Sequence, residues 1–149
     1  MTEHPSFSTT IGWDPAGGTS YVTISQVKDI TGPSISRDTI EVTHRDISNN
    51  YKVFWGGYAD GGELGFDLVW DPKEDTHIDT AGTGLLADFE DQDNCTLPAW
   101  QLETDVCGGT ATWTFDGRPT GFEQESPENG VLGASLTVKI SGKPTLTVT

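Results

Sequence analysis

The densest group of possible metal ligands in the sequence is an acidic run over residues 88–94, DFEDQDN. Carboxylates supply the oxygen ligands that Ca²⁺ prefers. A calcium loop of the EF-hand type starting at Asp91 needs glycine at its sixth position and glutamate at its twelfth. Those positions hold Thr96 and Leu102. We therefore interpret the run as the solvated end of a helix, and we predict no metal site.

The histidines and cysteines do not suggest a metal site either. His4, His44 and His77 are scattered, and none lies at ligand spacing from a cysteine or another histidine. Cys95 and Cys107 flank a predicted strand. At about 3.3 Å per residue, that strand separates them well beyond the roughly 7 Å between alpha carbons that a disulfide spans. We expect two reduced thiols, as in a protein that folds in a reducing cytoplasm.

Motifs for catalysis or cofactor binding do not occur in the sequence. There is no nucleophile elbow, phosphate loop or dinucleotide fingerprint. The 23 acidic residues guarantee chance carboxylate pairs, so such pairs alone do not indicate acid–base catalysis. We predict a protein that is not an enzyme, with no catalytic residues, no cofactor and no metal.

The charge balance limits the possible partners. Eight basic residues against 23 acidic ones give a net charge of −15. Nucleic-acid binding requires a basic stripe that releases counterions from phosphates, so stable adhesion to DNA is not expected. Three explanations for the acidity stay open: a surface that repels DNA, simple solubility, and a high-salt habitat. The last is suggested by 14 Asp against 9 Glu and by only 5 Lys.

The best candidate for a binding surface is an aromatic stretch over residues 44–62, which we expect to form a long loop. It holds Tyr51, Phe54, Trp55 and Tyr58 among pairs of glycine and asparagine. A long loop this aromatic is uncommon unless it packs against something. Two interpretations stay open. Trp55 and Tyr58 fold back over the sheet, or the four aromatics are subunit-interface residues, because tyrosine and tryptophan are enriched at buried interfaces.

The remaining elements are mainly strands, because glycine and proline separate short runs rich in Val, Ile, Thr and Trp. The predicted strands are Thr19–Val27, Thr39–Thr43, Glu63–Asp71, Trp100–Val106, Thr110–Asp116, Thr120–Ser126, Val131–Ser141 and Thr145–Thr149. Two hairpins are expected, one across the Cys107-Gly108-Gly109 turn and one across residues 127–130. The pattern indicates a β-sandwich or barrel.

One short helix is predicted from Asp75 or Thr76 to Glu90. Apolar residues recur there at helical spacing, at Ile78, Ala81, Leu85 and Phe89. Residues 1–18 are expected to form an N-terminal arm and residues 19–149 a single domain. No run approaches the roughly 20 apolar residues of a membrane span, and the first residues lack the features of a signal peptide. We expect neither membrane insertion nor secretion.

Three stretches, taken in order, resemble the major tail proteins, or tail tube proteins, of long-tailed viruses of the siphovirus type. They are Ile30–Ser34 with Asp38–Thr43, then Gly56–Phe66 with Leu85, Leu86 and Phe89, then Trp113–Phe115 with Thr120–Glu123 and Ala134–Thr145. Together they span roughly residues 20 to 149, so the resemblance leaves out the predicted arm.

The resemblance implies a tail-tube β-sandwich with one flanking helix, assembled into hexameric rings that stack. Part of each sheet then lines a β-barrel lumen through which DNA passes without stable binding, and residues 44–62 contact neighbouring subunits or the next ring. It also implies a place in the virion tail after assembly in the host cytoplasm, with the tape measure protein and tail-end proteins as partners. Six copies at −15 each give −90 per ring, and an acidic lumen keeps DNA off its wall.

The alternatives belong to other classes. One is a tail terminator or a capsid decoration protein built on the same fold class. Another is a secreted β-sandwich that binds carbohydrate or calcium through exposed tryptophans and aspartates.

Overall fold

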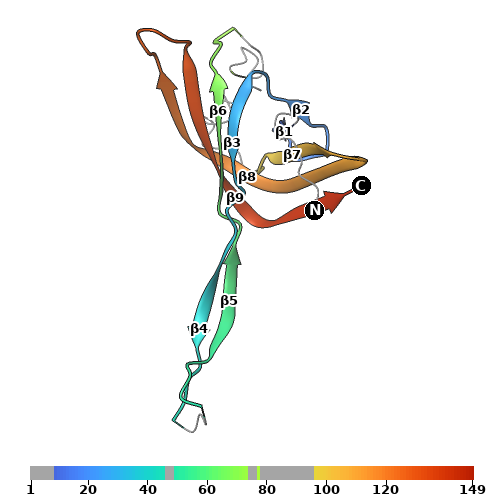
Figure 1. The fold of residues 1–149 in the computed structure, drawn as a ribbon. Coiled ribbons are helices and arrows are strands. Elements are labelled where there is room, and N and C mark those ends of the chain that lie inside the picture. Colours follow the sequence, from blue (N-terminus) through green and yellow to red (C-terminus); the bar gives the residue numbers. More distant parts are fainter. Residues whose placement is uncertain (1–8, 46–48, 74–76, 78–95) are drawn as a thin grey trace.

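The computed structural model describes residues 9–45, 49–73, 77 and 96–149, which form an all-β fold (Figure 1). The strands in chain order are β1 (Thr9–Asp14), β2 (Val22–Thr23), β3 (Val27–Thr31), β4 (Ser36–Glu41), β5 (Phe54–Asp60), β6 (Glu63–Val69), β7 (Ala99–Val106), β8 (Gly109–Glu125) and β9 (Gly133–Val148). No helix lies within the described ranges, and so none that could cross a membrane. The helix predicted up to Glu90 lies outside the described residues, except for His77.

Seven of the described strands form one antiparallel sheet in the order β2-β1-β7-β8-β9-β6-β3, and β4 pairs with β5 in a separate two-stranded sheet. The β7–β8 hairpin closes where Val106 pairs with Gly109. Gly108 in its turn takes a φ of 89°, which costs glycine little. The β8–β9 hairpin closes where Glu125 pairs with Gly133. Both predicted hairpins are confirmed.

β8 and β9 are single long strands of 17 and 16 residues, where the sequence predicted four shorter ones. The pairing of β8 with β9 shifts register twice, between Thr114 and Asp116 and between Pro119 and Gly121. Such irregularities bend a strand and increase its twist without ending it. Pro119 and Gly121 therefore lie at a bend in β8 and not at the end of a strand.

The bends curl the sheet into a half-barrel. The rings of Phe66 on β6 and Trp100 on β7 have centroids only 6.3 Å apart. β8 and β9 lie between these strands in the sheet, and neighbouring strands are about 4.8 Å apart, so a flat sheet holds β6 and β7 about 14 Å apart. One curled sheet thus encloses the core, whereas a sandwich uses two stacked sheets. The all-β prediction is confirmed, and of the two predicted forms, sandwich or barrel, the described sheet takes that of a half-barrel.

The inner face of the half-barrel is apolar because side chains alternate along the strands. Leu64, Phe66 and Leu68 of β6 are each at most 2% exposed, as are Leu136 and Val138 of β9. The register sets Phe66 opposite Leu136 and Leu64 opposite Val138. Burial of each such side chain contributes about 1.5–3 kcal/mol, so this double row is a large part of what holds the fold. The residues between them face outward.

Residues 9–14, which the sequence placed in an irregular arm, form strand β1. They pair with β7 along their whole length. Ile11 and Trp13 are 1% and 2% exposed and belong to the core. The sheet therefore begins before residue 19, while residues 1–8 of the predicted arm lie outside the described residues.

A buried carboxylate ends β1 and shapes the turn that follows. Asp14 accepts hydrogen bonds from the backbone N–H groups of Ala16, Gly18 and Ser20 at 2.9, 3.1 and 3.1 Å. Buried carboxylates are tolerated when they are hydrogen-bonded in this way. The Pro15–Gly18 stretch is thus an ordered turn around Asp14.

Candidate subunit interface

The β4–β5 hairpin continues the β3–β6 strand pair beyond the main sheet. Ile30 pairs with Phe66 in the sheet, and Ser36 pairs with Asp60 in the hairpin. In both pairs the two residue numbers add up to the same value. The hairpin therefore keeps the pairing register of β3 and β6 across the break between the two sheets. Residues 36–45 and 49–60, called here the projecting hairpin, extend away from the half-barrel (Figure 1).

The prediction of a long loop over residues 44–62 is wrong for residues 54–60, which form β5. The glycine pairs were read as loop signals, yet Gly56 pairs with Thr39 in the ladder. A Cβ at Gly56 would lie 3.0 Å from Cδ of Arg37. Glycine here lets the Arg37 side chain lie over the strand.

The four candidate interface residues are all exposed in the single chain. Tyr51 is 74% exposed, Phe54 53%, Trp55 68% and Tyr58 92%. The interpretation in which Trp55 and Tyr58 fold back over the sheet is therefore wrong. Large apolar side chains left exposed together on one element are typical of an interaction surface, so the projecting hairpin is the strongest candidate for one.

Both faces of the projecting hairpin carry apolar side chains. Ile40 lies directly opposite Trp55, and Glu41 lies directly opposite Phe54. Opposed residues share a face, so Ile40 and Trp55 form a patch on one side and Phe54 lies on the other. Every residue of β4 is exposed. An isolated two-stranded hairpin is marginally stable in water, so this one is a candidate for completion by a partner.

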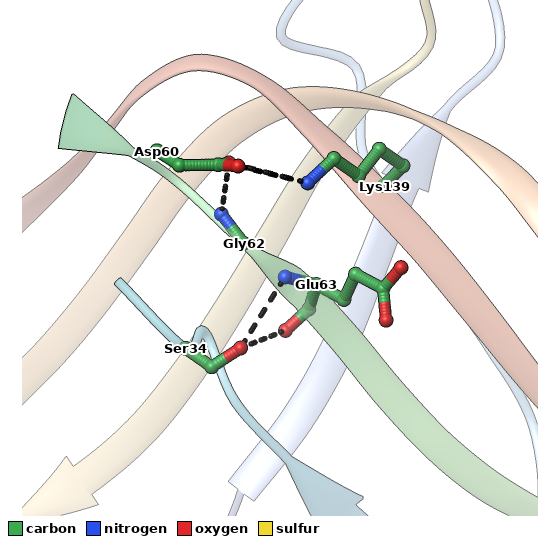
Figure 2. A network of polar contacts seen from close by, with 5 residues as sticks. All are labelled: Ser34, Asp60, Gly62, Glu63 and Lys139. Atoms are coloured by element: carbon green, nitrogen blue, oxygen red, sulfur yellow. Dashed lines mark hydrogen bonds and ion pairs between the residues drawn. The ribbon is translucent and has the colours of Figure 1, made fainter. Parts of the chain in front are cut away.

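Polar contacts hold the root of the projecting hairpin against the half-barrel (Figure 2). The Asp60 carboxylate accepts a hydrogen bond from the Gly62 backbone N–H at 2.8 Å and lies 3.2 and 3.3 Å from Nζ of Lys139 on β9. The pKa of Asp60 is lowered, first by the Gly62 hydrogen bond and then by Lys139. The carboxylate thus connects the end of β5 to β9 of the main sheet.

A second set of contacts lies beside the first (Figure 2). Ser34 Oγ accepts a hydrogen bond from the Glu63 backbone N–H at 3.4 Å and donates to the Glu63 carbonyl at 3.5 Å. Gly62 takes a φ of 75°, and a Cβ on it would lie 1.9 Å from the carbonyl oxygen of Ser34. The chain path at the root therefore requires glycine at position 62.

The outward-facing side chains of β6, β9 and the second half of β8 form a polar surface, called here the outer face. Asp67 lies opposite Ser135, which lies opposite Glu123, so one row crosses three strands. Ser135 Oγ donates to Oδ1 of Asp67 at 2.7 Å. The charged residues of the three strands on this face are Glu63, Asp67, Glu123 and Glu125, with Arg118 and Lys139. Four acids against two cations leave it acidic.

The sheet behind the outer face has two different open edges within the described part of the chain. β7 pairs with β8 as far as Asp116, and the Gly117 N–H donates to the Pro98 carbonyl at 3.1 Å, so Arg118–Glu125 pair with β9 alone. At the other side, β3 pairs only with β6. Unpaired strand edges are templates for pairing with another chain. Two different edges on one chain allow a head-to-tail contact, which closes into a ring when the rotation permits.

Among the described residues there is no group of three or more His, Cys, Asp or Glu side chains placed to hold a metal ion. The acidic run over 88–94 and Cys95 lie outside those residues, so the predictions about them stay predictions. Cys107 is exposed in the β7–β8 turn.

Open sheet edges and an exposed aromatic hairpin are typical of a structural protein that assembles. Residues 7–147 match the family described as "Lambda phage tail tube protein, TTP". The chain therefore belongs to the lambda phage tail tube protein family, a family of structural tail components and not of enzymes. The resemblance drawn from the sequence is confirmed, as are the non-enzymatic role and the place in the virion tail.

Solved structures of tails and injection systems share the fold. A chain of the tail of an empty gene transfer agent particle, refined with C6 symmetry, has a TM-score of 0.76 at 18% identity, covering 97% of this chain and 99% of that one. A chain of the native gene transfer agent virion has a TM-score of 0.73 at 16% identity, with 97% and 99% covered. The sheath/tube terminator structure of an extracellular contractile injection system gives 0.70 at 16% identity, with 99% and 98% covered. No curated protein matches the chain.

Proposed function

We propose that the chain assembles into hexameric rings that stack into a tail tube, and that the tube conducts DNA into the host. The observation that carries the proposal is the four-stranded sheet of β3, β6, β9 and the second half of β8, with an open edge on each side. Joining β3 of one copy to β8 of the next closes a barrel of 24 strands from six copies of four. The C6 symmetry of the similar gene transfer agent tail supports that number of copies.

The outer face lines the lumen of this barrel. Its side chains near the middle are small or acidic, with Thr137 opposite Gly65 on one side and Gly121 on the other. Small residues keep the channel wide, and the acids repel the phosphates of passing DNA. DNA therefore passes without stable binding, in keeping with the net charge of −15 per chain.

The projecting hairpin supplies the contact with a neighbouring copy, through Tyr51, Phe54, Trp55 and Tyr58. The support for this is their exposure in the single chain, between 53% and 92%. Aromatic side chains at the centre of an interface carry much of its binding energy once water is excluded. Assembly takes place in the host cytoplasm, with the tape measure protein inside the tube and tail-end proteins at its two ends.

Electron microscopy of the purified full-length protein tests the proposal. We expect extended tubes of stacked rings with six-fold symmetry. A tail terminator gives single rings that do not stack, and a capsid decoration protein or a secreted binding module gives neither. Dispersed particles at every concentration and salt condition would exclude a tube-forming function.

A further inference from the structure

A groove of about 620 Å³ lies where the root of the projecting hairpin meets β9. Its apolar lining includes Ile35, Tyr58, Ile140 and Pro144. Ile35 and Tyr58 are 52% and 92% exposed, so the groove has an unoccupied apolar side in the single chain. It has room for an apolar side chain of a partner.

The groove holds as many cations as acids in an otherwise strongly acidic protein. Its lining contains Arg37 and Lys143, and also Asp38 and Asp60. Asp60 is paired at 3.2 Å with Lys139, which stands beside the lining. Because Lys139 neutralises Asp60, the two lining cations face only Asp38 as an unpaired acid, in a chain with eight cations against 23 acids. A partner surface that complements the groove is therefore acidic with an apolar side chain.

The turn between β8 and β9 has this character. Glu128 is exposed on it, Glu125 is exposed at the end of β8 beside it, and residues 123–132 include no lysine or arginine. Val131 on the same turn is 68% exposed. The turn lies at the end of the molecule opposite the projecting hairpin, at the top of the view in Figure 1.

We infer that the β8–β9 turn of one copy docks in the groove at the hairpin root of a copy in the next ring. Val131 enters beside Tyr58 and Pro144, and the glutamates approach Arg37 and Lys143. Complementary surfaces at opposite ends of one chain make a head-to-tail contact that repeats without closing, which produces a stack. The inference rests on the proposed tube, and it names the surfaces that join one ring to the next.

Charge reversal on each side tests the docking. Lys143→Glu and Glu128→Lys should each raise the protein concentration needed for tubes by roughly tenfold, since each replaces an attraction by a repulsion. The two changes combined should restore assembly to near the wild-type concentration. Lys73→Glu, an exposed change outside both surfaces, makes the same shift in net charge from −15 to −17 as Lys143→Glu and should leave assembly unchanged.

The readout is electron microscopy over a dilution series, with rings and tubes counted separately. Single reversals that leave rings but few tubes support the inference, as does restoration in the combined variant. If both single variants form tubes at the wild-type concentration, the docking is wrong while the tube function stands. Loss of rings as well as tubes would also overturn it, because the charges then act within a ring. If the wild-type protein itself forms no rings or tubes, that result contradicts the proposed function, on which the docking rests.

Discussion

The imidazole of His77 lies parallel to the indole of Trp70, with ring centroids 5.6 Å apart and an angle of 10° between the planes. His77 is fully buried. Its Nδ1 accepts a hydrogen bond from the Asp71 backbone N–H at 3.1 Å, so Nε2 carries the proton and donates to the Ser25 carbonyl at 2.8 Å. One neutral side chain thus connects the end of β6 to the segment that leads into β3.

Replacing His77 should destabilise the fold of the unassembled chain. His77→Ala leaves the Asp71 N–H and the Ser25 carbonyl without this partner and opens a cavity beside Trp70. We expect the free energy of unfolding in urea to fall by about 2–4 kcal/mol. His44→Ala, at an exposed position, should change it by less than about 0.5 kcal/mol. Equal effects of the two substitutions would show that the buried contacts of His77 contribute nothing.

Two glycines with the same backbone requirement give a matched test of the hairpin root. Gly62 and Gly108 take φ values of 75° and 89°, but a Cβ at Gly62 meets the Ser34 carbonyl at 1.9 Å while one at Gly108 meets nothing within 4 Å. Gly108→Ala should cost about 1 kcal/mol from the left-handed backbone alone. Gly62→Ala should cost at least about 2 kcal/mol more, because the root must also shift. Urea unfolding of both variants measures the difference, and similar costs would mean that the root adapts freely.

Asp60 should make a pH-dependent contribution to stability. Its pKa is lowered from the ordinary 3.8, so the contribution is fully present above about pH 4 and is lost as the pH falls through the lowered value. Asp60→Asn should therefore lower the melting temperature at about pH 7 and have little effect at about pH 2. Asp29→Asn, which removes an exposed charge on β3, serves as the control. A deficit for Asp60→Asn that is the same at both pH values would contradict the charged contact with Lys139.

The aromatic residues of the projecting hairpin should act in assembly and not in folding. Trp55→Ala with Tyr58→Ala should leave the melting temperature of the unassembled chain nearly unchanged, since both side chains are mostly exposed. The same variant should form few tubes, because it removes the anchors of the contact. Val22→Ala, an exposed apolar change outside the hairpin, controls for surface hydrophobicity. Normal tubes from the double variant would show that these residues are not at an interface.

Local sequence patterns predicted much of the sheet. The predicted strands Glu63–Asp71 and Val131–Ser141 coincide closely with β6 and the first half of β9, where burial alternates because a pleated strand exposes every second side chain. The hairpin turn at Gly108 could also be predicted from the sequence, since glycine there directly follows a predicted strand. These features depend only on neighbours in the chain.

Other features depend on contacts far apart in the sequence, and here the patterns misled. Gly56, Gly57 and Gly62 signalled a loop, although the first two lie inside a strand and the third supports a close approach to Ser34. Asp14 looked like part of a polar lead-in, yet it is buried with its hydrogen bonds satisfied. The four aromatics were singled out from the sequence as interface candidates, and the structure leaves all four exposed. Their exposure became clear only when Phe54–Asp60 was seen to pair with Ser36–Glu41 away from the core.

The central claim is that the protein forms a tube with an acidic lumen. The most direct test is a reconstruction of the assembled protein at side-chain resolution, which shows the residues that line the inner wall. We predict a lumen lined by β3, β6, β9 and the second half of β8, with Glu63, Asp67 and Glu123 facing the channel and acids outnumbering cations. A tube with a neutral or basic inner wall, or one lined by other strands, would contradict the account of an acidic conduit for DNA.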